Sequence, residues 1–128
     1  MGAGDEINAQ VTYLGNNVYQ LSIANVTRGV SYTVPSSYTT SSSGLRTLAE
    51  WIVEAPSSSG GVLRLANFGT AHFFNCQATL SGATGPIDNT GWFVDPLTMI
   101  DPKGGKAVAS GITDAAGTSS FTVTYSSR

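Results

Sequence analysis

Alternation of apolar and polar side chains is the feature that most limits how this chain can fold. Apolar residues occupy every second position from Ile7 to Tyr13, and Gly15-Asn16-Asn17 follows as a turn signal. The alternation resumes over residues 19–23. Because successive side chains of an extended strand point to opposite faces, the two segments predict a β-hairpin with one apolar face.

The same pattern predicts further strands along the rest of the chain. These are residues 30–34, 46–55, 62–65, 70–80, 97–100, 107–112 and 120–125. Gly, Pro, Ser and Asn separate the segments, and a Ser/Thr-rich loop is expected over about residues 36–44. No segment has the 3.6-residue period of a helix. We therefore predict an all-β, antiparallel β-sandwich, with residues 1–128 forming a single domain.

The low charge of the chain bears on where it can work. Charged residues make up 11% of the chain, less than half of the roughly 25% usual in soluble domains. Acid unfolds proteins largely by protonating carboxylates that are paired in the native state, and the eight Asp and Glu leave few such pairs to lose. The composition fits work in acid, and it also fits an ordinary Ser/Thr-rich β protein.

Several classes of protein are not expected. The six Lys and Arg are scattered, so the chain offers no basic surface for nucleic acid or anionic membrane. It has no run of about 18 apolar residues and no basic and apolar leader, so neither a membrane span nor an export signal is expected. The single cysteine, Cys76, excludes an intrachain disulfide and is expected to be a small buried apolar residue.

The usual catalytic and metal-binding motifs are also missing. His72 is the one histidine, and neither a Gly-x-Ser-x-Gly elbow nor a Cys-Gly-Ser-Cys context accompanies it, which favours an ordinary strand histidine. Asp88, Asp95, Asp101 and Asp114 lack the spacing of a calcium loop. We expect them to form hydrogen bonds within turns, and we expect no metal or other cofactor.

Two carboxylates interrupt the apolar segment 48–56. In a strand, Glu50, Ile52 and Glu54 share one face, and at about 3.3 Å per residue the two carboxyl groups lie about 13 Å apart, too far to form a dyad. A glutamate beside Ile52 on a concave sheet face would be partly buried and suited to general acid/base chemistry. From the residues alone, the favoured interpretation is that both glutamates face solvent on the open side of a sheet.

Several segments, in order, resemble one family, the glutamic peptidases or eqolisins. The main match is Ala49-Glu50-Trp51-Ile52-Val53-Glu54, followed by the stretch from Leu65 to Phe73. Gly4-Asp5-Glu6-Ile7, Asn25-Val26-Thr27-Arg28-Gly29 and residues 120–125 resemble the flanking strands and turn of the family. The resemblance covers nearly the whole chain.

The resemblance implies a concanavalin-like (lectin-like) sandwich of two antiparallel sheets, an acidic working pH, a polypeptide substrate and a secreted parent protein. It also implies a Glu/Gln dyad that activates water, with the catalytic glutamate at Glu50. Glu50 would act as general base and then protonate the leaving amine, while the glutamine amide stabilises the oxyanion. Trp51, Glu54 and Phe68 would be supporting or substrate-binding residues.

The chain departs from the family in lacking the catalytic glutamine. That residue belongs to a strand upstream of the matched segments, and Gln10, Gln20 and Gln77 do not lie in its sequence context. The resemblance therefore implies the C-terminal part of the family domain, without its N-terminal strands. Loss of one oxyanion donor typically costs about 10²–10³ in rate, so we expect the chain to be inactive alone.

Two expectations follow about partners and about an alternative function. Unpaired sheet edges favour association, so we expect a homodimer or complementation by the missing N-terminal segment. The alternative to a peptidase is a non-catalytic β-sandwich that uses Trp51, Trp92 and tyrosines to hold carbohydrate or peptide.

Overall fold

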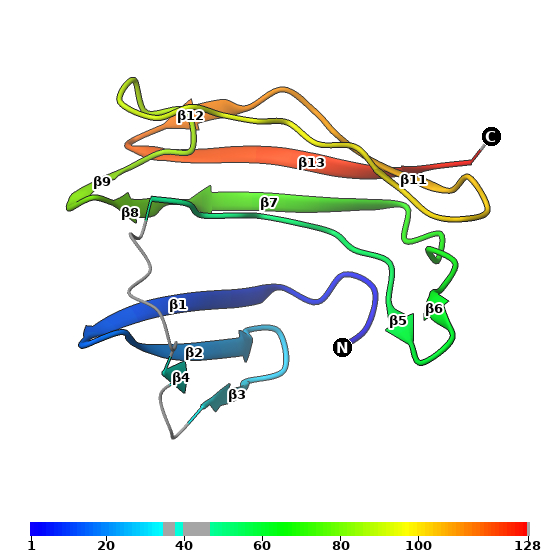
Figure 1. Cartoon of the computed structure of the whole chain (residues 1–128), viewed down its shortest axis with the longest axis horizontal. Coiled ribbons are helices and arrows are strands. Elements are labelled where there is room, and N and C mark those ends of the chain that lie inside the picture. The colour runs from blue at the N-terminus through cyan, green and yellow to red at the C-terminus, as the bar shows by residue number, and fades with distance from the viewer. Residues whose placement is uncertain (35–37, 40–46, 128) are drawn as a thin grey trace. The chain divides into compact units, whose positions relative to one another are not determined.

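The computed structural model describes residues 1–34, 38–39 and 47–127, and all regular structure among them is β-strand (Figure 1). The strands are β1 (Ile7–Gly15), β2 (Val18–Asn25), β3 (Val30–Thr33), β4 (Tyr38–Thr39), β5 (Ser57–Ser58), β6 (Gly61–Val62), β7 (Thr70–Cys76), β8 (Ala78–Leu80), β9 (Ala83–Gly85), β10 (Met99–Ile100), β11 (Lys106–Ala109), β12 (Thr113–Ala115) and β13 (Thr118–Ser126). Every strand pair is antiparallel. The predicted all-β antiparallel fold is confirmed. The described residues contain no helix that could cross a membrane.

The chain divides into two compact units, Met1–Leu45 and Arg46–Arg128. In the first unit, β1 pairs with β2, and β2 pairs also with β3 and β4. The turn between β1 and β2 places Asn16 (φ 51°) and Asn17 (φ 59°) in the left-handed region, which Asn tolerates better than most residues. The predicted hairpin is confirmed.

The sheet of the first unit has an apolar face and a polar face. Val11 lies opposite Leu21, and Ile23 lies opposite Tyr32. Cross-strand partners point to the same side, so these four side chains share one face, and all four are exposed.

Asp5 joins the two N-terminal segments that resemble the family. Its carboxylate accepts hydrogen bonds from Asn25 Nδ2 at 2.7 Å and from Arg28 Nε at 2.8 Å. The Thr27 hydroxyl also accepts a hydrogen bond from the Glu6 N–H at 2.8 Å. These bonds tie the start of β1 to the turn after β2.

In the second unit, β10, β11, β13 and β7 form one sheet in that order, and β12 also pairs with β13. Phe73 and Phe121 lie opposite each other and stack with ring centroids 4.6 Å apart. The core consists of Leu65, Ala107 and Val123, which are 4%, 3% and 6% exposed. The buried Cys76 thiol lies at the end of β7, as expected for a small apolar residue.

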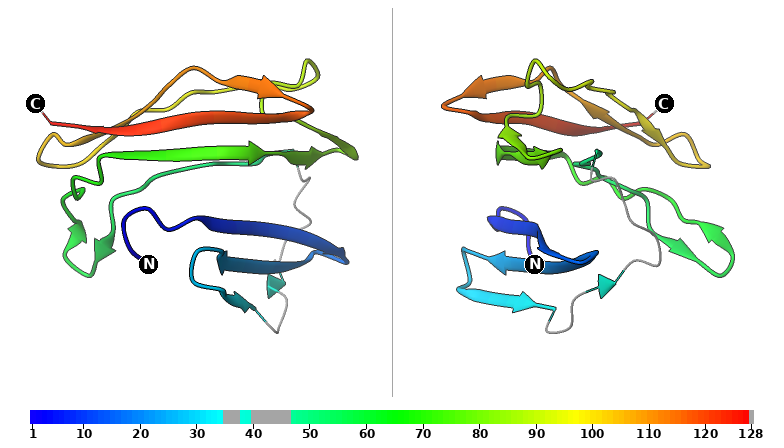
Figure 2. Two further views of the ribbon diagram at one scale, coloured as in Figure 1. Left: turned by 180° about the vertical axis from the view of Figure 1, so that it is seen from behind. Right: turned by 60° about the vertical axis from the view of Figure 1, so that its left-hand side comes forward.

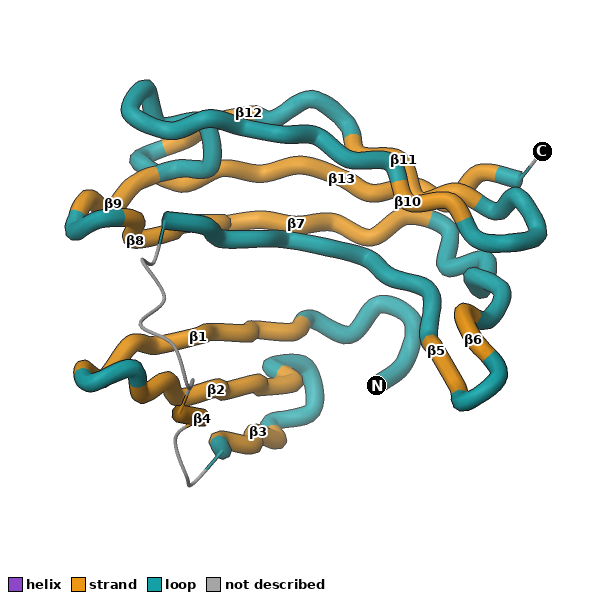
Figure 3. The backbone as a smooth tube through the Cα atoms, viewed as in Figure 1, coloured by secondary structure: helices purple, strands orange, loops and turns teal. Residues whose placement is uncertain are grey.

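The strand predicted over residues 46–55 is not found in the described residues 47–55, and residue 46 lies outside the described part. The prediction of a strand here is wrong. The segment 47–56 runs beside β7 as a loop in all views (Figures 1, 2 and 3). The segment still alternates, because Trp51 and Val53 are half-buried whereas Glu50, Ile52 and Glu54 are exposed. Alternation in sequence predicts which side chains are buried on one side of the segment. A β-strand also needs backbone hydrogen bonds to a neighbouring strand, and no described strand pairs with this segment.

Other predicted strands differ in extent. Of residues 62–65 only Val62 is in a strand, and the segment 70–80 breaks at Gln77 into β7 and β8. Shortly before that break, inside β7, Asn75 has φ 54°, at the point where the register between β7 and β13 shifts. Within 107–112 the strand β11 ends at Ala109. The predicted loop over 36–44 lies outside the described residues except for 38–39.

Candidate active site

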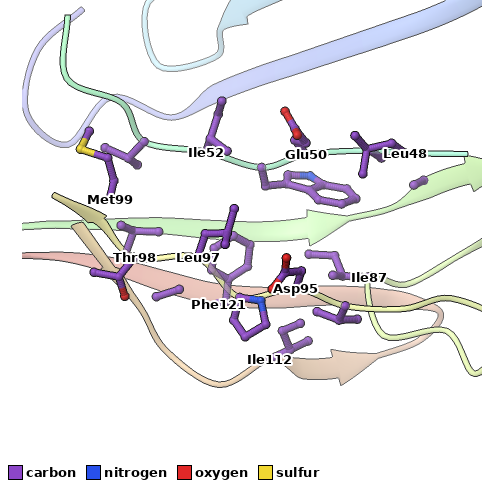
Figure 4. Close-up of a pocket in the computed structure, with 18 of the residues that line it drawn as sticks. Leu48, Glu50, Ile52, Ile87, Asp95, Leu97, Thr98, Met99, Ile112 and Phe121 are labelled. Atoms are coloured by element: carbon purple, nitrogen blue, oxygen red, sulfur yellow. The ribbon is translucent and has the colours of Figure 1, made fainter. Parts of the chain in front are cut away.

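A cavity of about 670 Å³ in the second unit adjoins the segment predicted to be catalytic (Figure 4). Its walls come from residues 47–54 and 92–99, and its floor is the inner face of the sheet, including Phe121 and Val123. Most of the lining is aliphatic or aromatic, as in many binding pockets.

Glu50 lies on the outer side of its segment. Figure 4 shows its carboxylate on the opposite side of the backbone from Leu97 and Phe121. The side chain is exposed, and no hydrogen bond or ion pair joins it to another described residue. The expected partial burial of Glu50 is therefore wrong, because Trp51 and Val53 take the covered face. Of the two interpretations of the sequence, the exposure agrees with glutamates on an open face.

The structure brings three of the four predicted site residues to the cavity. Glu50, Trp51 and Glu54 line it. Phe68 instead packs against the core and against Tyr125, in an edge-to-face contact with ring centroids 6.1 Å apart. That position gives Phe68 a part in holding the sheet.

Two residues that we did not assign to a peptidase site also line the cavity. Trp92 and Asp95 belong to the wall formed by residues 92–99, and Figure 4 shows Asp95 across the cavity from the segment that carries Glu50. Asp95 is exposed and makes no side-chain hydrogen bond to a described residue, contrary to the expectation of a turn contact. The sequence does carry a signal for Asp95. Asp95 follows the apolar residues 92–94 in the same way as Glu54 follows the apolar residues 51–53.

The ionisable groups of the cavity are all acidic. Glu50, Glu54 and Asp95 are the ionisable residues of the lining, although the carboxylate of Glu50 points away from Leu97 and Phe121 (Figure 4), and no Lys, Arg or His lines it among the described residues. Those residues also contain no group of three or more potential metal ligands. No glutamine lines the cavity, and the Gln77 amide donates to the Gly117 carbonyl at 3.4 Å.

Asp101 holds its own turn and Leu65 of the core together. One carboxylate oxygen accepts the N–H of Lys103 at 2.7 Å and of Gly105 at 3.0 Å, and the other accepts the N–H of Leu65 at 2.7 Å. Burial of Asp101 would raise its pKa, but these three hydrogen bonds, aided by the charge of Arg64, hold the pKa below the ordinary value. The expected turn contacts of Asp101 are confirmed, and the bond to Leu65 adds a long-range link to the core.

The family of the chain follows from comparison with known proteins. The model of the Peptidase A4 family matches residues 1–125. The chain therefore belongs to the Peptidase A4 family, the glutamic peptidases, as the resemblance indicated.

Two proteins of Aspergillus niger are similar to this chain. Aspergillopepsin-2 is 35% identical over 88 residues, which are 68% of this chain and 31% of that protein. This chain thus spans about a third of the length of that relative. The crystal structure of aspergilloglutamic peptidase matches 98% of this chain and 69% of its own, with 29% identity and a TM-score of 0.70. The fold is the antiparallel β-sandwich of that structure.

Proposed function

We propose that this chain carries the glutamate half of the catalytic site of an acid-acting endopeptidase, with Glu50 as general base. The observation that carries the proposal is the position of Glu50 directly before Trp51, within the segment that resembles the family signature and at the rim of the cavity. Its exposure supports the assignment, because a base that activates water needs access to water.

The proposed reaction uses one water molecule and one carboxylate. Glu50 removes a proton from water while the water oxygen attacks the peptide carbonyl carbon, which forms a tetrahedral oxyanion. Glu50 then gives the proton to the amide nitrogen, and the C–N bond breaks. Glutamate side chains ordinarily titrate near pH 4.3, so a glutamate base is best suited to acid.

The oxyanion needs a donor that the described cavity lacks. In the family a glutamine amide has this role, and no described glutamine lines the cavity. We propose that the donor comes from a segment equivalent to the part of aspergilloglutamic peptidase that this chain does not match. A second copy of the chain is the other candidate source.

The test is cleavage of an unfolded protein substrate at about pH 3.5, near the ordinary titration range of glutamate. The chain is assayed alone and with the part of aspergilloglutamic peptidase that it does not match. We expect activity in the mixture, a loss of about 10²–10⁴ in rate for Glu50→Gln, and measurable activity for Glu54→Gln. The reverse ranking would assign the base to Glu54, and full activity in both variants would exclude a glutamate mechanism.

A non-catalytic binding module is the second candidate, because Trp51 and Trp92 line the same cavity. Paired aromatic side chains can hold a sugar ring or an apolar peptide side chain. Tryptophan fluorescence of the Glu50→Gln variant, titrated with oligosaccharides and peptides, separates the two functions. Saturable binding by a chain that never cleaves in any mixture would favour the binding module.

A further inference from the structure

We propose that the peptide bond between Asp95 and Pro96 is a site of self-cleavage in acid, at which the Asp95 side chain cuts its own main chain. An Asp–Pro bond breaks in acid more readily than other peptide bonds, because a carboxyl group lies beside it and the leaving nitrogen is the basic ring nitrogen of proline. The chain contains two such bonds, Asp95–Pro96 and Asp101–Pro102. The structure exposes the first and protects the second.

The first bond lies in the wall of the cavity formed by residues 92–99, and both Asp95 and Pro96 are exposed. The Asp95 carboxylate makes no hydrogen bond or ion pair with a described residue. Residues 93–97 belong to no strand, and no backbone hydrogen bond joins them to the described part of the chain. The carboxyl group can therefore turn toward the carbonyl carbon of its own residue, and water reaches the bond.

The reaction consumes one water molecule for each bond cut. A side-chain oxygen of Asp95 attacks the carbonyl carbon of the same residue and closes a five-membered cyclic anhydride, while the carboxyl proton moves to the Pro96 nitrogen. The C–N bond breaks and releases Pro96 as a new amino terminus. Water then opens the anhydride, which leaves Asp95 as a new carboxyl terminus with its side chain restored. Because the reaction needs only these two residues and water, it does not rest on the proposed peptidase activity.

The second bond, Asp101–Pro102, is an internal control, because the same dipeptide is fixed there in a buried turn. Asp101 is 3% exposed, and both of its side-chain oxygens accept backbone N–H groups. Its own N–H donates to the Gly105 carbonyl at 2.8 Å, and its carbonyl accepts the Gly104 N–H at 3.0 Å. To attack its own carbonyl carbon, the side chain would have to give up at least one hydrogen bond. Each such bond to a charged acceptor corresponds to about tenfold or more in an equilibrium constant.

The charge of Asp101 protects its bond as well. Burial would raise the pKa of Asp101, but its three backbone hydrogen bonds and the charge of Arg64 hold the pKa below the ordinary value. The group therefore keeps its negative charge in acid in which an ordinary aspartate takes up a proton, and it has no proton to give to the Pro102 nitrogen.

The cut would open one wall of the cavity without separating the two pieces of the chain. Strand β7 lies before the cut and β13 after it, and the two strands pair with each other. The stacked rings of Phe73 and Phe121 also join the pieces. Figure 4 shows Asp95 across the cavity from the segment that carries Glu50. Time spent in acid would therefore loosen the wall 92–99 while the sheet persists.

The test is incubation of the whole chain in acid, at the lowest pH between about 3 and 4 at which circular dichroism shows the native spectrum. Mass spectrometry of samples taken over several days identifies the fragments. We expect fragments 1–95 and 96–128 to accumulate, and the cut after Asp101 to be at least about tenfold slower. In guanidinium chloride at the same pH, the two bonds should break at rates within about threefold of each other, because unfolding releases Asp101.

Three variants test the chemistry of the cut. Asp95→Asn removes the carboxyl group and should abolish the cut after residue 95. Asp95→Glu keeps an exposed carboxyl group before Pro96 but lengthens the side chain, so the cut should slow by about tenfold or more as the five-membered ring is lost. Glu50→Gln should be cut at the rate of the wild type, since the proposed peptidase base has no part in the reaction.

Four outcomes would overturn the proposal. An intact Asp95–Pro96 bond in the folded chain would do so, whether or not the denatured chain is cut there. Equal rates after Asp95 and Asp101 in the folded chain would also contradict it, because the structure distinguishes the two carboxylates. An undiminished cut in Asp95→Asn would exclude the side chain as the attacking group, and loss of the cut in Glu50→Gln would assign it to peptidase activity.

Discussion

Asp101 illustrates how one buried carboxylate can organise residues that the sequence keeps apart. Both of its oxygens accept backbone hydrogen bonds, two from its own turn and one from Leu65 in the core. The sequence predicted the turn contacts, because Asp before Pro-Lys-Gly-Gly is a turn signal. The bond to Leu65 could not be predicted, since it depends on how two distant segments pack.

We expect Asp101→Asn to lower the thermal unfolding midpoint by several degrees at about pH 5.5, where the native carboxylate is ionised. An amide has one acceptor oxygen where the carboxylate uses two, so at least one buried N–H loses its partner. Because the pKa of Asp101 is lowered, its contribution is present above the unfolded value and is lost as pH falls through the folded pKa. The difference between wild type and variant should therefore shrink as pH falls through the lowered pKa of folded Asp101.

Thermal unfolding followed by circular dichroism over this pH range measures this difference. Asp95→Asn is the matched control, because Asp95 is exposed and bonds to no described residue through its side chain. A midpoint for Asp101→Asn equal to that of the control at about pH 5.5 would contradict the structural role.

At the scale of elements, turns set how well the strands could be predicted. The β1–β2 hairpin was predictable because Asn16 and Asn17 suit the left-handed turn and the flanking residues alternate. The segment 47–56 alternates just as clearly, yet it is not a strand among the described residues. Its alternation comes from one-sided burial alone, because strand assignment depends on backbone partners that the sequence of one segment does not specify.

The turn between β12 and β13 offers a test of this local chemistry. Ala116 has φ 51° and Gly117 has φ 79°, and the left-handed region costs a residue with a Cβ about 1–2 kcal/mol. Asn tolerates this region better than Ala, so Ala116→Asn should raise the free energy of unfolding by about 0.5–1 kcal/mol.

Gly117→Ala is the matched opposite change. A Cβ at Gly117 meets no atom within 4 Å, so any loss, expected to be about 1–2 kcal/mol, reflects backbone conformation rather than a clash. Urea unfolding of both variants measures the effects. If both variants raise the free energy of unfolding, or both lower it, the backbone conformation of the turn does not control the stability of this hairpin.

At the scale of the whole molecule, the family resemblance and the all-β class were predictable because they rest on local patterns spread along the chain. The cavity was not, since Asp95 and Trp92 reach it through packing of distant segments. Local patterns also say nothing about how the exposed apolar face of the first sheet is covered in solution.

We expect the chain to associate with itself through that face. Val11 and Leu21 lie opposite each other and are 66% and 42% exposed, and neighbouring apolar side chains in water favour burial by about 25 cal/mol per Å². In the described residues β1 pairs on one side only, and an unpaired edge can add strands from another chain.

Sedimentation velocity over a range of protein concentrations measures this association. The wild type should shift toward larger species as concentration rises, and Val11→Thr with Leu21→Thr should weaken the shift. Gln10 and Ser22 form the neighbouring cross-strand pair on the opposite face, so Gln10→Thr with Ser22→Thr should leave it unchanged. A wild type that stays monomeric throughout, or equal weakening by both double variants, would rule out the apolar face as the contact, because only the first pair removes apolar surface.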